Sequence, residues 1–171
     1  MDEPVFDPET FSGTVPIFPL PDVVLFPGTV LPLHIFEPHY REMTRAALEG
    51  ERLIAMARLK PGWEKDYEGH PPICEIMGMG RIIQDERQED GRYNLMVAGV
   101  ARVRLEEEIQ REPFRMARVE VLRERPAEKS DAPRKRLLLL AFAAQMLKEL
   151  AKDAPALPQD TPLGVVCDLV A

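Results

Sequence analysis

Cysteine, serine and long apolar runs are all scarce in this sequence of 171 residues. The two cysteines, Cys74 and Cys167, form no Cys-x-x-Cys pair, so we interpret them as reduced, buried small side chains rather than a disulfide or metal site. No stretch approaches the roughly 18 apolar residues of a membrane-spanning helix. The opening, MDEPVFDPETFSG, lacks the basic and apolar regions of a signal peptide, which predicts a cytoplasmic protein with no membrane partner.

The residue groups that carry catalysis are missing as well. The sequence contains no GxxxxGK[ST] phosphate loop, no GxGxxG turn and no GxSxG elbow. Its two serines are Ser12 and Ser130, and Lys129 beside Ser130 makes no activated pair, because that chemistry needs a fixed, desolvated lysine. We therefore predict no catalytic residue, no cofactor and no enzymatic activity.

Metal-ligand chemistry is sparse. His34, Glu37 and His39 form the one grouping of suitable side chains, and their spacing matches no recognised site. The acidic run at 85–90 lacks the alternating ligands of an EF-hand. We interpret the histidines as ordinary hydrogen-bonded or solvated side chains and the acidic run as a charged hairpin tip, so no metal site is predicted.

Positive charge is in deficit, with a formal net charge of −7 and a pI near 5.1. Nucleic-acid binding draws much of its affinity from neutralised phosphates, so an acidic protein begins with an unfavourable field. Arginines are dense only between 102 and 125, where glutamates interleave with them. This mixture is typical of a solvated strand face with ion pairs, and no nucleic-acid partner is expected.

Proline, by contrast, is abundant: the chain has 17, and eight lie within the first 38 residues. Proline fixes its own φ and lacks an N–H, so this spacing predicts short extended pieces that turn often. We expect short strands near 15–18, 23–25 and 30–36, followed by a helix over about 38–49.

The middle of the chain has the pattern of a β domain. Residues 52–59 form a buried apolar run, and 73–84 form a strand in which Gly78 and Gly80 face the same side. Such positions permit sharp bending or the close approach of another backbone. Further strands are expected over 92–98, 100–106 and 114–122.

The C-terminal part has helical periodicity instead. An apolar stripe follows a 3.6-residue period over 134–151, after a polar linker at 124–133. A second helix is expected from Thr161, and its apolar face carries Leu163, Val166 and Leu169. The chain ends inside this helix, so we expect a truncated terminus. Because little chain is left to cover both apolar faces, a homodimer is our hypothesis.

The order of residues from Val15 to Leu48 resembles the opening of the Lon protease N-terminal domain. That family reads Pro-x-x-Pro-Leu, then an apolar run with Phe-Pro-Gly, then Pro-Leu and an aromatic before the first helix. The matching residues here are Pro16, Pro19, Leu20, Val23, Val24, Phe26, Pro27, Gly28, Pro32, Leu33 and Phe36. A second similar block is a strand that ends with Val97, Gly99 and Arg102.

The resemblance implies an α+β fold, namely a PUA-like, twisted antiparallel pseudobarrel of about six strands with one inserted helix, followed by a helical subdomain. The expected organisation is a disordered leader at 1–13, the Lon-type β domain at 14–123, a linker at 124–133 and a truncated helical subdomain at 134–171. It also implies a stand-alone bacterial protein without the ATPase and peptidase domains of Lon.

The implied function is non-catalytic recognition of unfolded or apolar protein segments, with a role as a proteolysis adaptor to a protease system. An RNA-binding PUA-like domain is the alternative. The candidate peptide-binding residues are Phe26, Phe36, Trp63 and Tyr67. Packing within their own domain is the competing interpretation for these side chains, although a loop rich in proline and glycine exposes Trp63 and Tyr67 more readily than a strand would.

Overall fold

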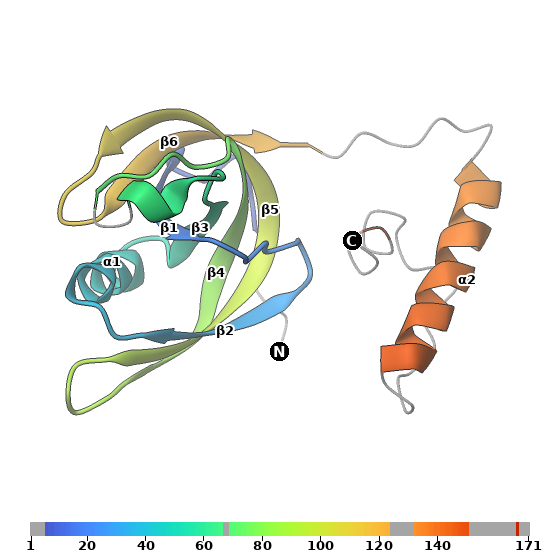
Figure 1. The fold of residues 1–171 in the computed structure, drawn as a ribbon, viewed down its shortest axis with the longest axis horizontal. Coiled ribbons are helices and arrows are strands. Elements are labelled where there is room, and N and C mark those ends of the chain that lie inside the picture. The colour runs from blue at the N-terminus through green and yellow to red at the C-terminus, as the bar shows by residue number, and fades with distance from the viewer. Residues whose placement is uncertain (1–5, 67–68, 124–131, 151–166, 168–171) are drawn as a thin grey trace. The chain divides into compact units, whose positions relative to one another are not determined.

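The computed structural model describes residues 6–66, 69–123, 132–150 and 167. The chain divides into two compact units, Met1–Leu122 and Arg123–Ala171. The elements of the first unit (Figure 1) are β1 (Thr14–Leu20), β2 (Val30–Ile35), α1 (Pro38–Glu49), β3 (Leu53–Arg58), a short 3-10 helix η1 (Trp63–Asp66), β4 (Ile76–Arg87), β5 (Tyr93–Gln110) and β6 (Arg115–Leu122).

The helix predicted over 38–49 is confirmed, and its ends follow from the sequence. Pro38 occupies the first turn, where its missing N–H would have had no partner in the helix. Beyond Glu49, the Gly50 N–H donates to the carbonyl oxygens of Ala46 and Ala47 at 3.1 and 3.2 Å and ends the helix. The strand expected near 23–25 is absent, because this stretch is a loop between β1 and β2.

The six strands form one sheet in the order β2-β5-β4-β3-β1-β6, and β6 also pairs with β5. Five strands therefore make a ring, and β2 lies outside it against β5. The α+β class, six strands and inserted helix agree with expectation, but the sheet is mixed and ring-like rather than an antiparallel barrel. β1 and β3 run parallel, with Ile17 opposite Ala55. The intervening β2 and α1 supply the long crossover that a parallel pair requires.

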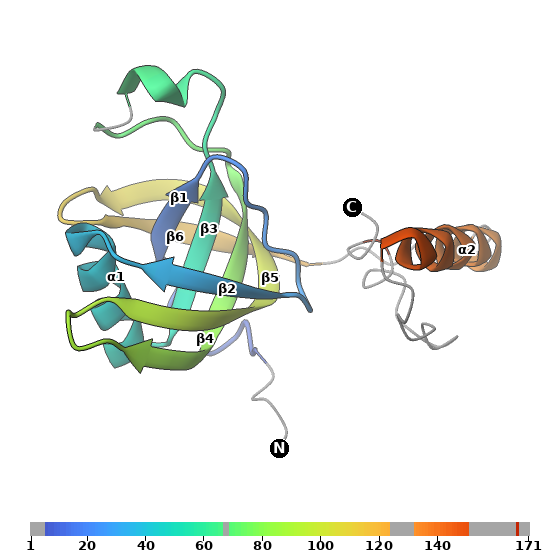
Figure 2. The same ribbon diagram turned by 60° about the horizontal axis from the view of Figure 1, so that its bottom comes forward.

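The core of the first unit consists of two clusters of buried side chains. One surrounds Ile17 and Met79 inside the ring. The other surrounds Ile54, where α1 contributes Met43 and Ala47. Figure 2 shows α1 beside the ring at the end of β2. Each fully buried aliphatic side chain stabilises the fold by roughly 1.5–3 kcal/mol, so these clusters fix α1 and the end of β2 in place.

The loop between β1 and β2 crosses two strands of the sheet at glycines. Its Leu25 is buried, with 2% of its surface exposed. A Cβ atom at Gly78 would overlap the carbonyl oxygen of Leu25, and one at Gly99 would overlap the carbonyl oxygen of Phe26. The expectation that Gly78 permits the close approach of another backbone is therefore confirmed, and that backbone is this loop.

The second unit contains α2 (Ala132–Leu150), which agrees with the helix predicted over 134–151. Leu137, Leu138 and Phe142 are exposed on it. Most of the predicted linker and the second predicted helix from Thr161, with Leu163, Val166 and Leu169, lie outside the described residues, as do residues 1–5 of the leader. None of the described helices is long and apolar enough to cross a membrane.

Residues 6–13, which belong to the predicted leader, pack against the β domain of the first unit. The rings of Phe6 and Phe11 pack edge to face, with centroids 5.9 Å apart, and both side chains lie against the first core cluster. The Ser12 hydroxyl donates to the Glu51 carboxylate at 2.6 Å, at the end of α1. This segment is thus tied to the β domain by both apolar packing and a charge-assisted hydrogen bond.

Candidate functional site

The first unit carries a groove of about 750 Å³. Six segments enclose it: the end of β1, the end of β2, the start of α1, Leu59 just after β3, the loop at 69–71 and the turn between β5 and β6. Most of its lining is apolar or aromatic, and the apolar side chains are Phe18, Leu20, Leu33, Ile35, Phe36, Tyr40, Leu59 and Phe114. The groove is therefore built mainly from the proline-rich N-terminal segment.

Alternation along β2 sets which side chains reach the core and which reach solvent. Leu33 and Ile35 pack against the second core cluster. His34 and Phe36 point to the opposite face, with their rings stacked and their centroids 6.2 Å apart. Phe36 is 57% exposed, although it is large and aromatic. An exposed aromatic beside an apolar groove is typical of a binding surface rather than of a core.

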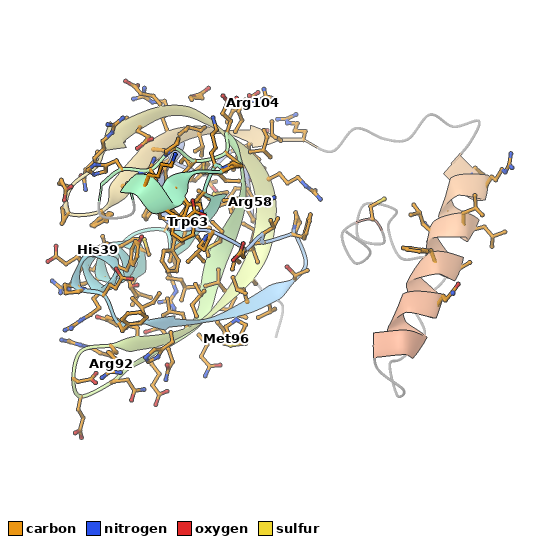
Figure 3. The ribbon with its side chains drawn as sticks, in the orientation of Figure 1. His39, Arg58, Trp63, Arg92, Met96 and Arg104 are labelled. Atoms are coloured by element: carbon orange, nitrogen blue, oxygen red, sulfur yellow. The ribbon has the colours of Figure 1, made fainter. Side chains whose placement is uncertain are left out.

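A second aromatic pair forms a fixed wall of the groove. The rings of Phe18 in β1 and Tyr40 in α1 meet edge to face, with centroids 4.5 Å apart. The His39 ring, which lies at the start of α1 (Figure 3), packs on Tyr40 at 3.9 Å between centroids. Because Phe18 is 7% exposed and anchored in the core, this wall keeps its shape without a ligand.

Charged side chains hold the rim of the groove. The Arg115 guanidinium donates to both oxygens of Glu108, at 3.0 and 2.6 Å, and to the Pro71 carbonyl oxygen at 2.9 Å. These bonds join β6, β5 and the loop at 69–71. Nearby, the Nε2 atom of His70 lies 3.0 Å from a carboxylate oxygen of Glu112, which ties the same loop to the β5–β6 turn.

The structure places the four candidate aromatics in different surroundings. Phe36 lines the groove. Phe26 is half-buried in the β1–β2 loop, under the Arg102 guanidinium at 5.7 Å from its ring centroid. Trp63, carried by η1 (Figure 3), is half-buried against the first core cluster. Tyr67 lies outside the described residues. Of the described candidates, one therefore belongs to the groove.

Sequence reasoning did not select Phe18, Tyr40 and Phe114 as site residues. Phe18 lies in the strand expected near 15–18 and Tyr40 in the helix expected over 38–49, where core packing is the ordinary expectation. No pattern in the sequence shows that the β5–β6 turn, which carries Phe114, reaches the end of β2. A signal was present in the density of apolar and aromatic residues between 15 and 40.

The groove has no metal-binding chemistry of its own. Among the described residues, no group of three or more His, Cys, Asp or Glu side chains could hold a metal ion. His34 Nδ1 lies 2.8 Å from the Oδ1 atom of Asn94 on β5, and His39 Nε2 lies 3.4 Å from the Glu37 carboxylate. What the groove does offer is apolar surface between fixed charges, which suits the binding of an apolar segment.

Comparison with known proteins assigns the chain to a family. The family model for the ATP-dependent protease La (LON) substrate-binding domain matches residues 14–165. The Lon protease of Cytophaga hutchinsonii is 29% identical over 167 residues, which cover 96% of this chain and 20% of that protein. The Lon protease of Roseiflexus castenholzii is 30% identical over 179 residues, covering 98% of this chain and 21% of that protein. The chain thus spans about a fifth of the length of these relatives.

Solved structures support the fold. A Lon N-terminal domain protein from Xanthomonas campestris matches with a TM-score of 0.58 at 21% identity, covering 78% of this chain and 73% of that chain. The N-terminal domain of Mycobacterium avium complex Lon protease matches with a TM-score of 0.56 at 22% identity, covering 81% and 68%. At this level of identity, the likeness concerns the fold alone.

Proposed function

Because the chain belongs to the Lon substrate-binding domain family, we propose that it is a protein-binding module that holds exposed apolar segments of unfolded proteins in its groove. The match covers the N-terminal fifth of the curated Lon proteases and not their catalytic domains, which supports a role in recognition. We further propose that captured segments pass to a proteolytic partner, which the names of the relatives suggest.

The single observation that carries the proposal is the exposed ring of Phe36 at an apolar groove. This ring is 57% exposed, while Phe18 and Tyr40, which also line the groove, form a fixed wall of it. Removing an aromatic side chain from water is favourable by roughly 1.5–3 kcal/mol. A segment that covers Phe36 therefore gains binding free energy. Folded proteins keep such segments inside, and this makes the groove selective for unfolded ones.

Fluorescence anisotropy tests the proposal. The probe is a fluorescein-labelled peptide of ten residues, with two lysines at each end and a centre in which Phe or Val alternates with Ser. We expect saturable binding, competition by reduced, carboxymethylated α-lactalbumin and no competition by the native disulfide-bonded form. The Phe36→Ser variant should bind about tenfold more weakly, which corresponds to the loss of one buried aromatic contact.

The matched control is Ile83→Ser. Ile83 lies on β4 outside the groove and is 42% exposed, so this change also removes an exposed apolar side chain. Its affinity should stay within about twofold of the unmodified chain, because surface substitutions away from a site have small effects. Equal losses in both variants, or no loss in Phe36→Ser, would show that the groove is not the binding site.

A further inference from the structure

One edge of β2 is free for hydrogen bonding at the groove. β2 pairs with β5 on one side, and no described strand pairs with its other side. The Gly99 N–H donates to the Thr29 carbonyl oxygen at 2.8 Å, where the β2–β5 ladder begins. Backbone groups alternate in direction along an antiparallel pair, so Leu31, Leu33 and Ile35 face β5. The backbone groups of Val30, Pro32 and His34 therefore face the free side.

Proline limits which of these groups can bond. Pro32 lacks an N–H, so the free edge near the groove offers the His34 N–H and the carbonyl oxygens of Pro32 and His34. β1 is also open there, because β6 pairs with β1 over 14–17 and no described strand lies on that side of 18–20. Pro19 falls on the open side and again supplies no N–H. Of the two edges, β2 therefore offers both a donor and acceptors.

The charges around the groove specify the occupant further. Arg111 and Arg115 share one carboxylate, Glu108, which lies 3.7 Å from Arg111 Nε and bonds Arg115 in two places. Glu37 and Glu112 also line the groove, and the ion-pair partners described for them are imidazoles. The rim therefore holds three carboxylates, Glu108 included, against two guanidinium groups, and this excess of negative charge on a chain with a net charge of −7 favours a segment that carries basic side chains.

We propose that the occupant of this groove is an extended peptide segment with basic flanks, and that it adds to the sheet as a strand along the free edge of β2. Alternate side chains of the added strand face the wall formed by Phe18 and Tyr40, and the others lie beside His34 and Phe36. Main-chain bonds to His34 and Pro32 supply affinity that does not depend on the sequence of the segment. This proposal rests on the proposed function and defines how the same groove binds.

The first test compares His34→Pro with His34→Ala, using the lysine-flanked peptide and anisotropy. Both variants lack the imidazole, and they differ in the backbone N–H that the added strand needs. We expect His34→Pro to bind at least about tenfold more weakly than His34→Ala. This difference corresponds to the loss of one hydrogen bond, with its acceptor on the peptide left unpaired. Thermal unfolding of both variants checks that each is folded. Equal affinities of two folded variants would overturn strand addition.

The second test modifies the peptide and uses the unmodified chain, so it is valid even if His34→Pro fails to fold. Each of the six central residues is N-methylated in turn. A strand bonded along one edge should lose at least about fivefold in affinity at alternate positions and little between them. Equal effects at all positions, or none, would overturn the proposal.

A third test replaces the lysines of the peptide by glutamates. This change should weaken binding about fivefold or more, and unchanged affinity would overturn the proposal that the bound segment has basic flanks.

The outcomes separate the two proposals. If the peptide binds and depends on Phe36 but shows neither alternation nor sensitivity to His34→Pro, the groove binds side chains without strand addition, and the inference fails while the proposed function stands. If no peptide binds, both fail.

Discussion

Arg115 is 6% exposed, an unusual position for a guanidinium group, and its partners explain how it is tolerated. Glu108 accepts two hydrogen bonds from it, and the Pro71 carbonyl oxygen accepts a third. A buried ion pair pays a desolvation penalty that good geometry can offset, whereas a broken pair leaves a charge with no compensation. We infer that this pair fixes the loop at 69–71 at the rim of the groove.

Substituting Glu108→Gln should lower the free energy of unfolding by about 2 kcal/mol, because it leaves the Arg115 charge uncompensated. The matched control is the neighbouring Glu107→Gln. Glu107 pairs with Arg118 at 2.9 Å, but both side chains are more than half exposed. The control should cost at most about 0.5 kcal/mol. Urea unfolding of the two variants measures the difference, and equal losses would contradict the role assigned to Arg115.

At the level of single residues, the sequence predicted backbone features better than it predicted which side chains lie close together. The missing Cβ atoms of Gly78 and Gly80 predicted sharp bending or the close approach of another backbone, and the second is what Gly78 shows. The pairing of Arg115 with Glu108 was not predictable, because the arginines between 102 and 125 have many glutamate neighbours. Burial separates this pair from the exposed ones, and burial depends on the loop at 69–71.

Among the elements, the β1–β2 loop connects the proline-rich segment to the sheet. Its chain crosses β4 and β5 at Gly78 and Gly99, and Leu25 fills the core beneath it. The Gly28 N–H donates to the Gly99 carbonyl oxygen at 2.9 Å, which secures the crossing. The loop thereby sets where β2 begins and, through β2, where Phe36 lies.

Gly99→Ala should destabilise the protein by about 3 kcal/mol, because its Cβ would overlap the Phe26 carbonyl oxygen and force a backbone shift. Gly28 lies in the β1–β2 loop, and a Cβ atom there would meet open space. Gly28→Ala therefore introduces only the strain of a φ of +80°, and we expect a destabilisation of about 1 kcal/mol. Unfolding in guanidinium chloride measures both destabilisations from the shift in midpoint, provided that the dependence of the free energy on denaturant is unchanged. The reverse order of the two losses would show that the loop does not press on β5 as described.

Most elements were predictable from local pattern, and their pairing was not. The helix at 38–49 followed from its proline start and glycine end. A period of two predicted strands but could not show that β1 lies parallel to β3, because both directions bury the same side chains. The stretch at 23–25, which was expected to be a strand, is a loop in which Leu25 fills the core without a neighbouring strand while Val24 is 53% exposed. The groove was not predictable, since it forms where six separate segments meet.

For the whole molecule, charge argues against an RNA-binding function. The exposed arginines of β5 and β6 have carboxylate partners, with Arg104 bonding Glu120 at 3.1 Å and Arg118 bonding Glu107 at 2.9 Å. Binding a phosphate would require these pairs to break on a chain with a net charge of −7.

We expect no measurable binding of single- or double-stranded RNA at physiological salt, as measured by anisotropy with labelled oligonucleotides. A sub-micromolar dissociation constant that rises steeply with salt would contradict this expectation and would favour the RNA-binding alternative. The lysine-flanked peptide, measured in the same buffer, serves as the positive control. The homodimer expected from the apolar faces of the two predicted C-terminal helices stays a prediction.

The central claim is that apolar segments bind in the groove between β2, α1 and the β5–β6 turn. Hydrogen–deuterium exchange of the full chain, alone and saturated with the lysine-flanked peptide, tests it most directly. We predict slower exchange over 33–40 and 111–115, and unchanged exchange over 83–87 on the β4 side. Unchanged exchange at the groove while the peptide is bound, or protection confined to another face, would contradict the account.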